Sequence, residues 1–153
     1  MLDKENLEKA KKIVKEFFQR MTIEGEIEIL SPKEETLSIN LKTEDPQILI
    51  GEKGQTLFEI QHLLKAILKR EISENFYIDL DINDYKKKKI EYLKDLARSV
   101  ADEVSLTKKE RILSPMPAYE RRIVHLEIAG RKDVTTESIG QDPERRVVIR
   151  PYP

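Results

Sequence analysis

Apolar and polar residues along the chain follow two periodicities, one typical of helices and one typical of strands. Spacings of three and four between apolar side chains predict helices with one buried face, and they occur in residues 3–20, 55–70 and 85–105. Strict alternation predicts half-buried strands, and it occurs in residues 26–30, 37–41 and 76–82. The chain is therefore expected to mix helices with short strands.

The first half of the chain predicts the element order α-β-β-α-α-β. Asp3 is the expected cap of the first helix, and a turn at residues 31–35 joins the first two strands into a hairpin. Pro46 opens a short helical turn that precedes the long helix. Because the alternation ends near Asn83 and a new helical period follows, we expect a first domain over residues 1–83.

Residues 84–153 predict a second, smaller domain of two helices and a small sheet. A short strand is expected at residues 110–114, followed by a helix from Pro117 to Ala129 that Gly130 ends. Two further alternating segments predict strands at residues 134–139 and 146–150. The expected fold class is α+β in two domains.

Composition excludes several functional classes. The 153 residues contain no Cys, so a disulfide framework, a thiolate metal site and a cysteine nucleophile are excluded. The longest apolar runs are far shorter than a membrane span, and the polar start of the chain has no secretory signal pattern. We therefore expect a cytoplasmic protein without membrane insertion and without a cofactor.

Charge is distributed unevenly, although the formal net charge of the whole chain is only −1. Residues 1–83 carry 12 Lys and Arg against 17 Asp and Glu, a net charge of −5. Residues 84–153 carry 16 against 12, a net charge of +4. This asymmetry indicates that the second domain is the more basic one.

A pair of glycines three residues apart, Gly51 and Gly54, separates an apolar run from the helix at residues 55–70. Glycine adopts φ values closed to other residues and has no Cβ, so a ligand can lie against the main chain here. Amides at a helix N-terminus favour an anion, and Lys53 adds a cation. The loop predicts a phosphate site, with a plain helix entry as the alternative for this motif alone.

Arg121 and His125 lie four residues apart on the predicted helix, so their side chains share one face. Together they form an expected exposed Arg-His edge that can grip an anion, and an ordinary surface Arg beside a hydrogen-bonded His is the alternative. Guanidinium groups bind phosphate through two parallel hydrogen bonds. Four further arginines of this domain add to the expected phosphate track: Arg122, Arg131, Arg145 and Arg146.

These motifs carry a resemblance to a known family. Residues 36–83 resemble a KH domain of the bacterial type II order, with Gly51-Glu-Lys-Gly54 as its loop. Residues 115–150 resemble the R-3-H domain, which binds single-stranded nucleic acid and is named for its Arg and His, here Arg121 and His125. A KH domain followed directly by an R-3-H domain is the layout of the Jag family, the SpoIIIJ-associated RNA-binding proteins also called KhpB.

The resemblance implies a protein that binds single-stranded RNA or DNA and acts as a post-transcriptional regulator. The loop would clamp the backbone, and Ile50, Leu57 and Ile60 are candidates for an apolar groove that receives bases, with plain core as the alternative. The family also implies a second small KH protein as a partner. The residues expected to bind nucleic acid are Gly51, Glu52, Lys53, Gly54, Arg121, Arg122, His125, Arg145 and Arg146.

The sequence departs from the family pattern in two places. Many members carry an additional N-terminal domain joined by a charged linker, and neither feature is expected here. Glu52 stands where KH loops often carry a basic residue, so it offsets part of the attraction of Lys53 for phosphate and predicts modest affinity for this domain alone.

Two other functional classes compete with RNA binding. A hydrolase would use His125 or His62 as a base, but the sequence places neither a nucleophile nor clustered carboxylates at a recognisable spacing, so we expect no enzyme. An adaptor that binds proteins and has little nucleic-acid affinity is the second alternative, favoured by the acidic first half.

Overall fold

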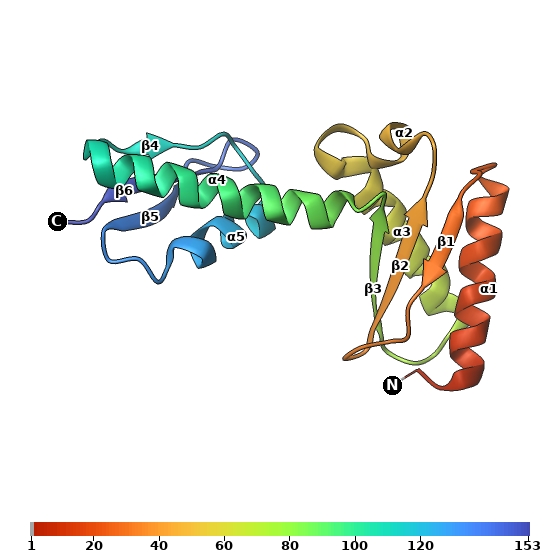
Figure 1. Cartoon of the computed structure of the whole chain (residues 1–153). Coiled ribbons are helices and arrows are strands. Elements are labelled where there is room, and N and C mark those ends of the chain that lie inside the picture. Colours follow the sequence, from red (N-terminus) through yellow and green to blue (C-terminus); the bar gives the residue numbers. More distant parts are fainter. Residues whose placement is uncertain (1) are drawn as a thin grey trace. The chain divides into compact units, whose positions relative to one another are not determined.

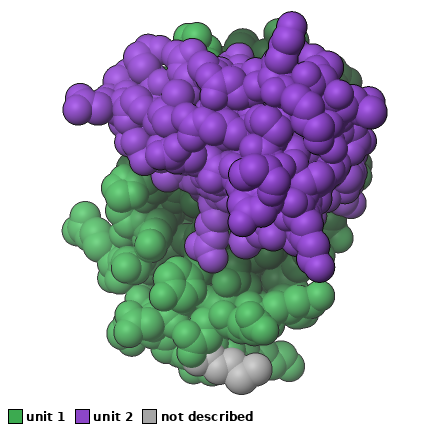
Figure 2. All heavy atoms as spheres, turned by 90° about the vertical axis from the view of Figure 1, so that its left-hand side faces the viewer, with its two compact units in different colours: residues 1–86 green, residues 87–153 purple. Residues whose placement is uncertain are grey.

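The structure is a computed structural model that describes residues 2–153 (Figure 1). The chain divides into two compact units, the first ending at Lys86 and the second comprising Lys87–Pro153. Figure 2 shows their atoms in green and purple. Helices and two separate three-stranded sheets confirm the α+β class.

The first unit has the predicted order of helices and strands, with one additional 3-10 turn. Antiparallel pairing of β1 with β2 confirms the predicted hairpin. The elements are α1 (Lys4–Arg20), β1 (Glu26–Ile29), β2 (Thr36–Lys42), α2 (Pro46–Ile50), η1 (Glu52–Gly54), α3 (Gln55–Glu71) and β3 (Tyr77–Ile82).

The sheet of the first unit has the order β1-β2-β3, and β2 pairs with β3 in parallel. Parallel neighbours need a crossover connection, and α2, η1 and α3 supply it. The register places Ile39 opposite Leu80, so apolar side chains of neighbouring strands share one face. The glycine loop belongs to this crossover, and the sheet and helices therefore fix its position.

Helices α1 and α3 bury their apolar faces against the sheet, as expected from their three-to-four spacing. The α1 N-terminus is capped as predicted, because the Asp3 carboxylate accepts a hydrogen bond from the Asn6 amide at 2.7 Å. The core combines side chains from both helices and from the strands: Val14, Phe18, Leu37, Ile39, Leu41, Leu57, Leu64, Leu68, Leu80 and Ile82.

The second unit is built around a long helix and an antiparallel sheet of order β4-β6-β5. Two details differ from the prediction: β4 is only two residues long, and α5 ends at Ile128 with Ala129 as its cap. Gly130 lacks the positive φ of a glycine C-cap. The elements are α4 (Tyr85–Thr107), β4 (Arg111–Ile112), α5 (Ala118–Ile128), β5 (Val134–Ile139) and β6 (Arg146–Pro151).

The core of the second unit lies between its two helices and one face of its sheet. Alternation along β6 places Val147 and Ile149 in that core. The segment before α5 extends along β6, since the Met116 amide donates to the Arg145 carbonyl at 3.1 Å. This contact fixes the entry to α5. The remaining core side chains include Leu93, Ala97, Val100, Val104, Val124, Ile128 and Val134.

Candidate nucleic-acid interface

The Gly-x-x-Gly loop is a tight turn with three residues in the left-handed region. Gly51, Lys53 and Gly54 have φ values of 71°, 54° and 80°. Steric repulsion disfavours this region for residues with a Cβ, so glycine suits two of the three positions. Lys53 takes the conformation without that advantage, and its side chain and that of Glu52 are exposed.

Packing gives a second reason for both glycines. A Cβ on Gly51 would lie 2.1 Å from Thr56 Oγ1, and a Cβ on Gly54 would lie 2.8 Å from a ring carbon of Tyr85. Gly54 is buried. Tyr85 therefore occupies the space where a Gly54 side chain would lie, and the expectation that a ligand contacts the main chain of this loop stays a prediction. The surface of the loop is provided by Glu52 and Lys53.

Two amides of the loop are already hydrogen-bonded within it. The Gly54 amide donates to the Gly51 carbonyl at 3.3 Å, and the Gln55 amide donates to the Glu52 carbonyl. The expected set of free amides is thus smaller than the sequence predicted.

Two of the three predicted groove residues belong to the core. Leu57 and Ile60 lie on the buried face of α3, whereas Ile50 is half-buried. The exposed apolar side chain next to the loop is instead Ile48, with 77% of its surface exposed. Because α2 is only five residues long, its apolar positions do not reveal which face is outward.

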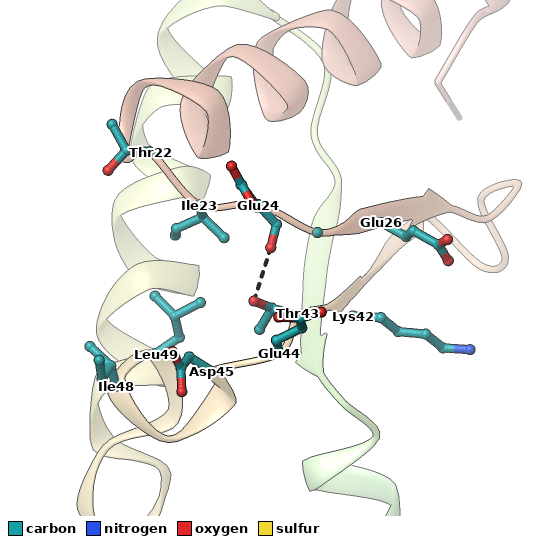
Figure 3. Close-up of a pocket in the computed structure, with 11 residues that line it drawn as sticks. Thr22, Ile23, Glu24, Glu26, Lys42, Thr43, Glu44, Asp45, Ile48 and Leu49 are labelled. Carbon is teal, nitrogen blue, oxygen red and sulfur yellow. Dashed lines mark hydrogen bonds between the residues drawn. The ribbon is translucent and has the colours of Figure 1, made fainter.

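Ile48 lines a pocket of about 680 Å³ between the end of α1, the start of β1 and α2 (Figure 3). Two of its lining residues are joined by a hydrogen bond, which the Thr43 hydroxyl donates to the Glu24 carbonyl at 3.0 Å. Four carboxylates and one lysine give the lining an acidic character. These side chains are Glu24, Glu26, Glu44, Asp45 and Lys42.

Arg121 occupies a different environment from the one predicted. It is only 7% exposed, so the expected exposed Arg-His edge is wrong for this residue. Its Nη1 donates to the Met116 carbonyl at 2.8 Å and lies 3.3 Å from Asp142 Oδ1. The guanidinium therefore supports the entry to α5 as well as carrying a positive charge.

His125 is held between two hydroxyl groups of β5. Its Nδ1 is 2.7 Å from Thr136 Oγ1, and its Nε2 is 2.7 Å from Ser138 Oγ. Residues 136 and 138 share one face of the strand, because side chains alternate along it. Burial lowers the pKa of His125 from its usual 6.5, and the charge of Arg121 lowers it further.

The hydroxyls satisfy the imidazole in either neutral tautomer. A neutral ring has one donor and one acceptor nitrogen, and a hydroxyl can take either role. Sequence reasoning missed Thr136 and Ser138, although their spacing of two on a predicted strand was a usable signal. Only the packing of α5 on β5 shows that both face His125.

The other predicted arginines differ in how firmly they are held. Arg122 is exposed. Arg145 donates from Nη1 to the Gly140 carbonyl at 2.6 Å, and Arg146 lies beside Glu144, with 3.6 Å between Nη2 and the carboxylate. Arg131 is fully engaged with two aspartates and is not a free phosphate ligand. The structure therefore brings Arg121 and His125 together and leaves Arg122 beside them on α5.

Within residues 2–153, no three His, Asp or Glu side chains gather as a metal site would require. The two histidines lie in different units, His62 on α3 and His125 on α5. No helix in the same part of the chain is long and apolar enough to cross a membrane.

Comparison with known proteins identifies the family of the second unit. Residues 91–151, which include α5 and the sheet of the second unit, match the R-3-H domain family. The chain is 36% identical to the RNA-binding protein KhpB of Clostridium symbiosum over 148 residues. The aligned segment covers 95% of this chain and 67% of that protein. The chain therefore belongs to the KhpB family.

Two other relatives carry the same name. The chain is 38% identical over 112 residues to the protein of Lactiplantibacillus plantarum, covering 73% of this chain and 35% of the relative. It is 34% identical over 116 residues to that of Bacillus subtilis, covering 74% and 56% respectively. The chain thus spans only about a third to a half of these two longer relatives.

Proposed function

We propose that the chain binds single-stranded RNA through two backbone-binding sites, one in each unit. In this proposal residues 1–83, which make up most of the first unit, act as a type II KH domain, and residues 84–153 act as an R-3-H domain. Support comes from the observed α-β-β-α-α-β order, from the match to the R-3-H family and from relatives named as RNA-binding proteins. On the family resemblance we add a cytoplasmic, regulatory role and a second small KH protein as partner.

The observation that carries the proposal is the cluster of Arg121, His125, Thr136 and Ser138. Two hydroxyls lie within hydrogen-bonding distance of one imidazole, and a guanidinium occupies the preceding turn of the same helix. Hydroxyl donors beside a fixed positive charge are suited to phosphate oxygens. The hydroxyls supply the direct contacts, while the buried Arg121 supplies the charge behind them.

His125 acts through these hydroxyls. When the ring is neutral, one hydroxyl uses its proton to bond the ring, so only the other can donate to phosphate. When the ring is protonated, both nitrogens donate and both hydroxyl protons turn outward. Phosphate binding is therefore coupled to proton uptake by His125.

The first unit contributes a weaker site. Lys53 offers a cation at the tip of the loop, and the pocket beside Ile48 is large enough for a nucleobase. Glu52 and the carboxylates around the pocket repel phosphate. We therefore assign most of the backbone affinity to the second unit.

A protein-binding adaptor is the second candidate, and the acidic pocket of the first unit favours it. Carboxylates around an exposed isoleucine suit a basic peptide better than an RNA backbone. The two candidates differ in their response to salt and in their dependence on the hydroxyls of the second unit.

A binding measurement with a labelled RNA of mixed sequence tests the proposal. Affinity should fall between about 50 and 200 mM salt, and Thr136→Val with Ser138→Ala should lower it roughly tenfold while the RNA stays intact. Ser114→Ala is the control, since it removes an exposed hydroxyl elsewhere in the second unit. A wild-type chain without measurable RNA binding would instead support the adaptor, and shortened RNA would support a hydrolase.

A further inference from the structure

A second pocket of the Lys87–Pro153 unit adjoins the Arg-His cluster. Its volume is about 480 Å³, within the range of small-ligand sites. Thr136 lines it and also bonds His125, and the Ala129 amide donates to the His125 carbonyl at 2.9 Å. The pocket is therefore adjacent to the two hydroxyl groups that contact His125, and it shares Thr136 with them. Its lining is Ile128, Ala129, Arg131, Lys132, Val134, Thr135, Thr136 and Tyr152.

Arg131 lines this pocket, and its hydrogen-bonding edge is already occupied. Its Nε and Nη2 donate to the two Asp133 oxygens at 2.9 and 2.7 Å, and its Nη1 donates to Asp102 at 2.6 Å. These hydrogen bonds, with Asp133 first, raise the pKa of Arg131 above its usual value. The two carboxylates occupy the edge of the guanidinium and together outweigh its single positive charge, so its flat face is the part suited to a ligand.

Tyr152 adds an aromatic ring at the rim. It is 57% exposed, and its backbone amide donates to the Asp133 carbonyl at 2.9 Å, which anchors this end of the chain beside β5. The buried side chains of Ile128 and Val134 form an apolar floor. A flat ring, a flat guanidinium and an apolar floor suit a planar, uncharged group better than a phosphate.

We propose that this pocket receives one nucleobase of the RNA strand whose phosphate is held by Thr136 and Ser138. The inference rests on the proposed function and adds a base-stacking site to it. Stacking recognises the face that every base has, so the pocket binds bases with little sequence preference. Thr136 connects the two parts, because it serves both the phosphate site and the pocket.

The experiment compares two short RNAs, one with a central 2-aminopurine and one with an abasic residue at the same place. Tyr152→Ala should weaken binding of the first roughly 5- to 100-fold and abolish quenching of its fluorescence. Tyr152→Phe should restore both. Affinity for the abasic RNA and the salt dependence should change little, since no phosphate contact is removed.

A filling variant and a matched control complete the test. Ala129→Leu places a larger side chain in the pocket without changing charge, and it should have the same effect as Tyr152→Ala. Tyr92→Ala removes a tyrosine of equal exposure on α4 and should leave both affinities unchanged. The base pocket would be overturned if the variants lost the same affinity for both RNAs. It would also be overturned if the wild-type chain bound the abasic RNA as tightly as the 2-aminopurine RNA. Failure of the wild-type chain to bind either RNA would instead overturn the proposed function.

Discussion

At the scale of single residues, the second unit buries Arg121, the side chain to which the proposed function assigns the charge of the phosphate site. A buried guanidinium must be compensated, and Arg121 is compensated by the Met116 carbonyl and by Asp142. The carbonyl holds the side chain in position, whereas the carboxylate cancels its charge. Since the Asp142 side chain is 72% exposed, an approaching phosphate competes with it directly.

Replacing Asp142 with Asn should therefore strengthen RNA binding. The change removes a negative charge from the phosphate site and leaves the contact between Arg121 and Met116 intact. We expect an increase in affinity of about 3- to 10-fold at low salt, decreasing as salt rises. Titration of a labelled RNA measures it. Glu110→Gln, which removes an exposed carboxylate from Arg150, is the control and should give a smaller increase.

The coupling between His125 and phosphate predicts a pH dependence of binding. The pKa of His125 is lowered from 6.5, so the imidazole of the free protein is neutral near pH 7 and becomes protonated only below pH 6.5. RNA favours the protonated ring, so affinity should rise as pH falls from about 7.5 to about 5.5.

Removing the imidazole isolates this effect. His125→Ala should weaken binding slightly at about pH 7.5 and more strongly at about pH 6, with a flatter pH profile. His62→Ala, which removes the histidine of the other unit, should keep the wild-type profile. If His125→Ala and wild type were separated by the same factor at every pH, protonation of this ring would have no role in binding.

At the scale of helices and strands, most elements could be predicted because each buries one face against one core. The periodicity of α1, α3 and β3 follows directly from that burial. The burial of Arg121 could not be predicted from the sequence, because it depends on which other segments pack against that side of α5. Here the segment at Met116 and the Asp142 side chain contact it. For the same reason Leu57 suits a groove by sequence and proves to be core.

Different residues of the loop between α2 and α3 are expected to serve binding and folding. Glu52 and Lys53 are exposed, and Lys53 has a positive φ that Asp tolerates better than most residues. Replacing both with Asp should therefore leave the melting curve unchanged and weaken RNA binding by like-charge repulsion. Unchanged RNA affinity with an unchanged melting curve would show that the loop is not a clamp.

A substitution at Gly51 provides the contrasting case. Gly51→Ala adds a Cβ 2.1 Å from Thr56 Oγ1 at a φ of 71°, so it should destabilise the first unit by about 1–3 kcal/mol. Denaturant unfolding followed by circular dichroism measures the loss. Weaker RNA binding by this variant would result from a less stable first unit. Weaker binding by the double Asp variant would result from the added negative charge.

At the scale of the whole molecule, the chain joins two units of opposite charge, and each carries its own candidate site. Residues 1–83 have a net charge of −5 and residues 84–153 a net charge of +4. In the proposed function an acidic unit with a weak site gains most from a basic neighbour, because the second unit would first hold the RNA and raise its local concentration. The weak site then adds affinity only when the strand is long enough to reach it.

RNA length should therefore decide whether the loop of the first unit contributes. With an RNA of about 5 nucleotides, the second unit binds alone, and the double Asp variant at Glu52 and Lys53 should bind like wild type. With an RNA of about 30 nucleotides, the same variant should bind roughly 10-fold more weakly, because the second contact is lost. Thr136→Val with Ser138→Ala should weaken binding of both RNAs, since that site holds the strand in either case. Equal effects of the loop variant on short and long RNA would mean that one strand does not engage both units.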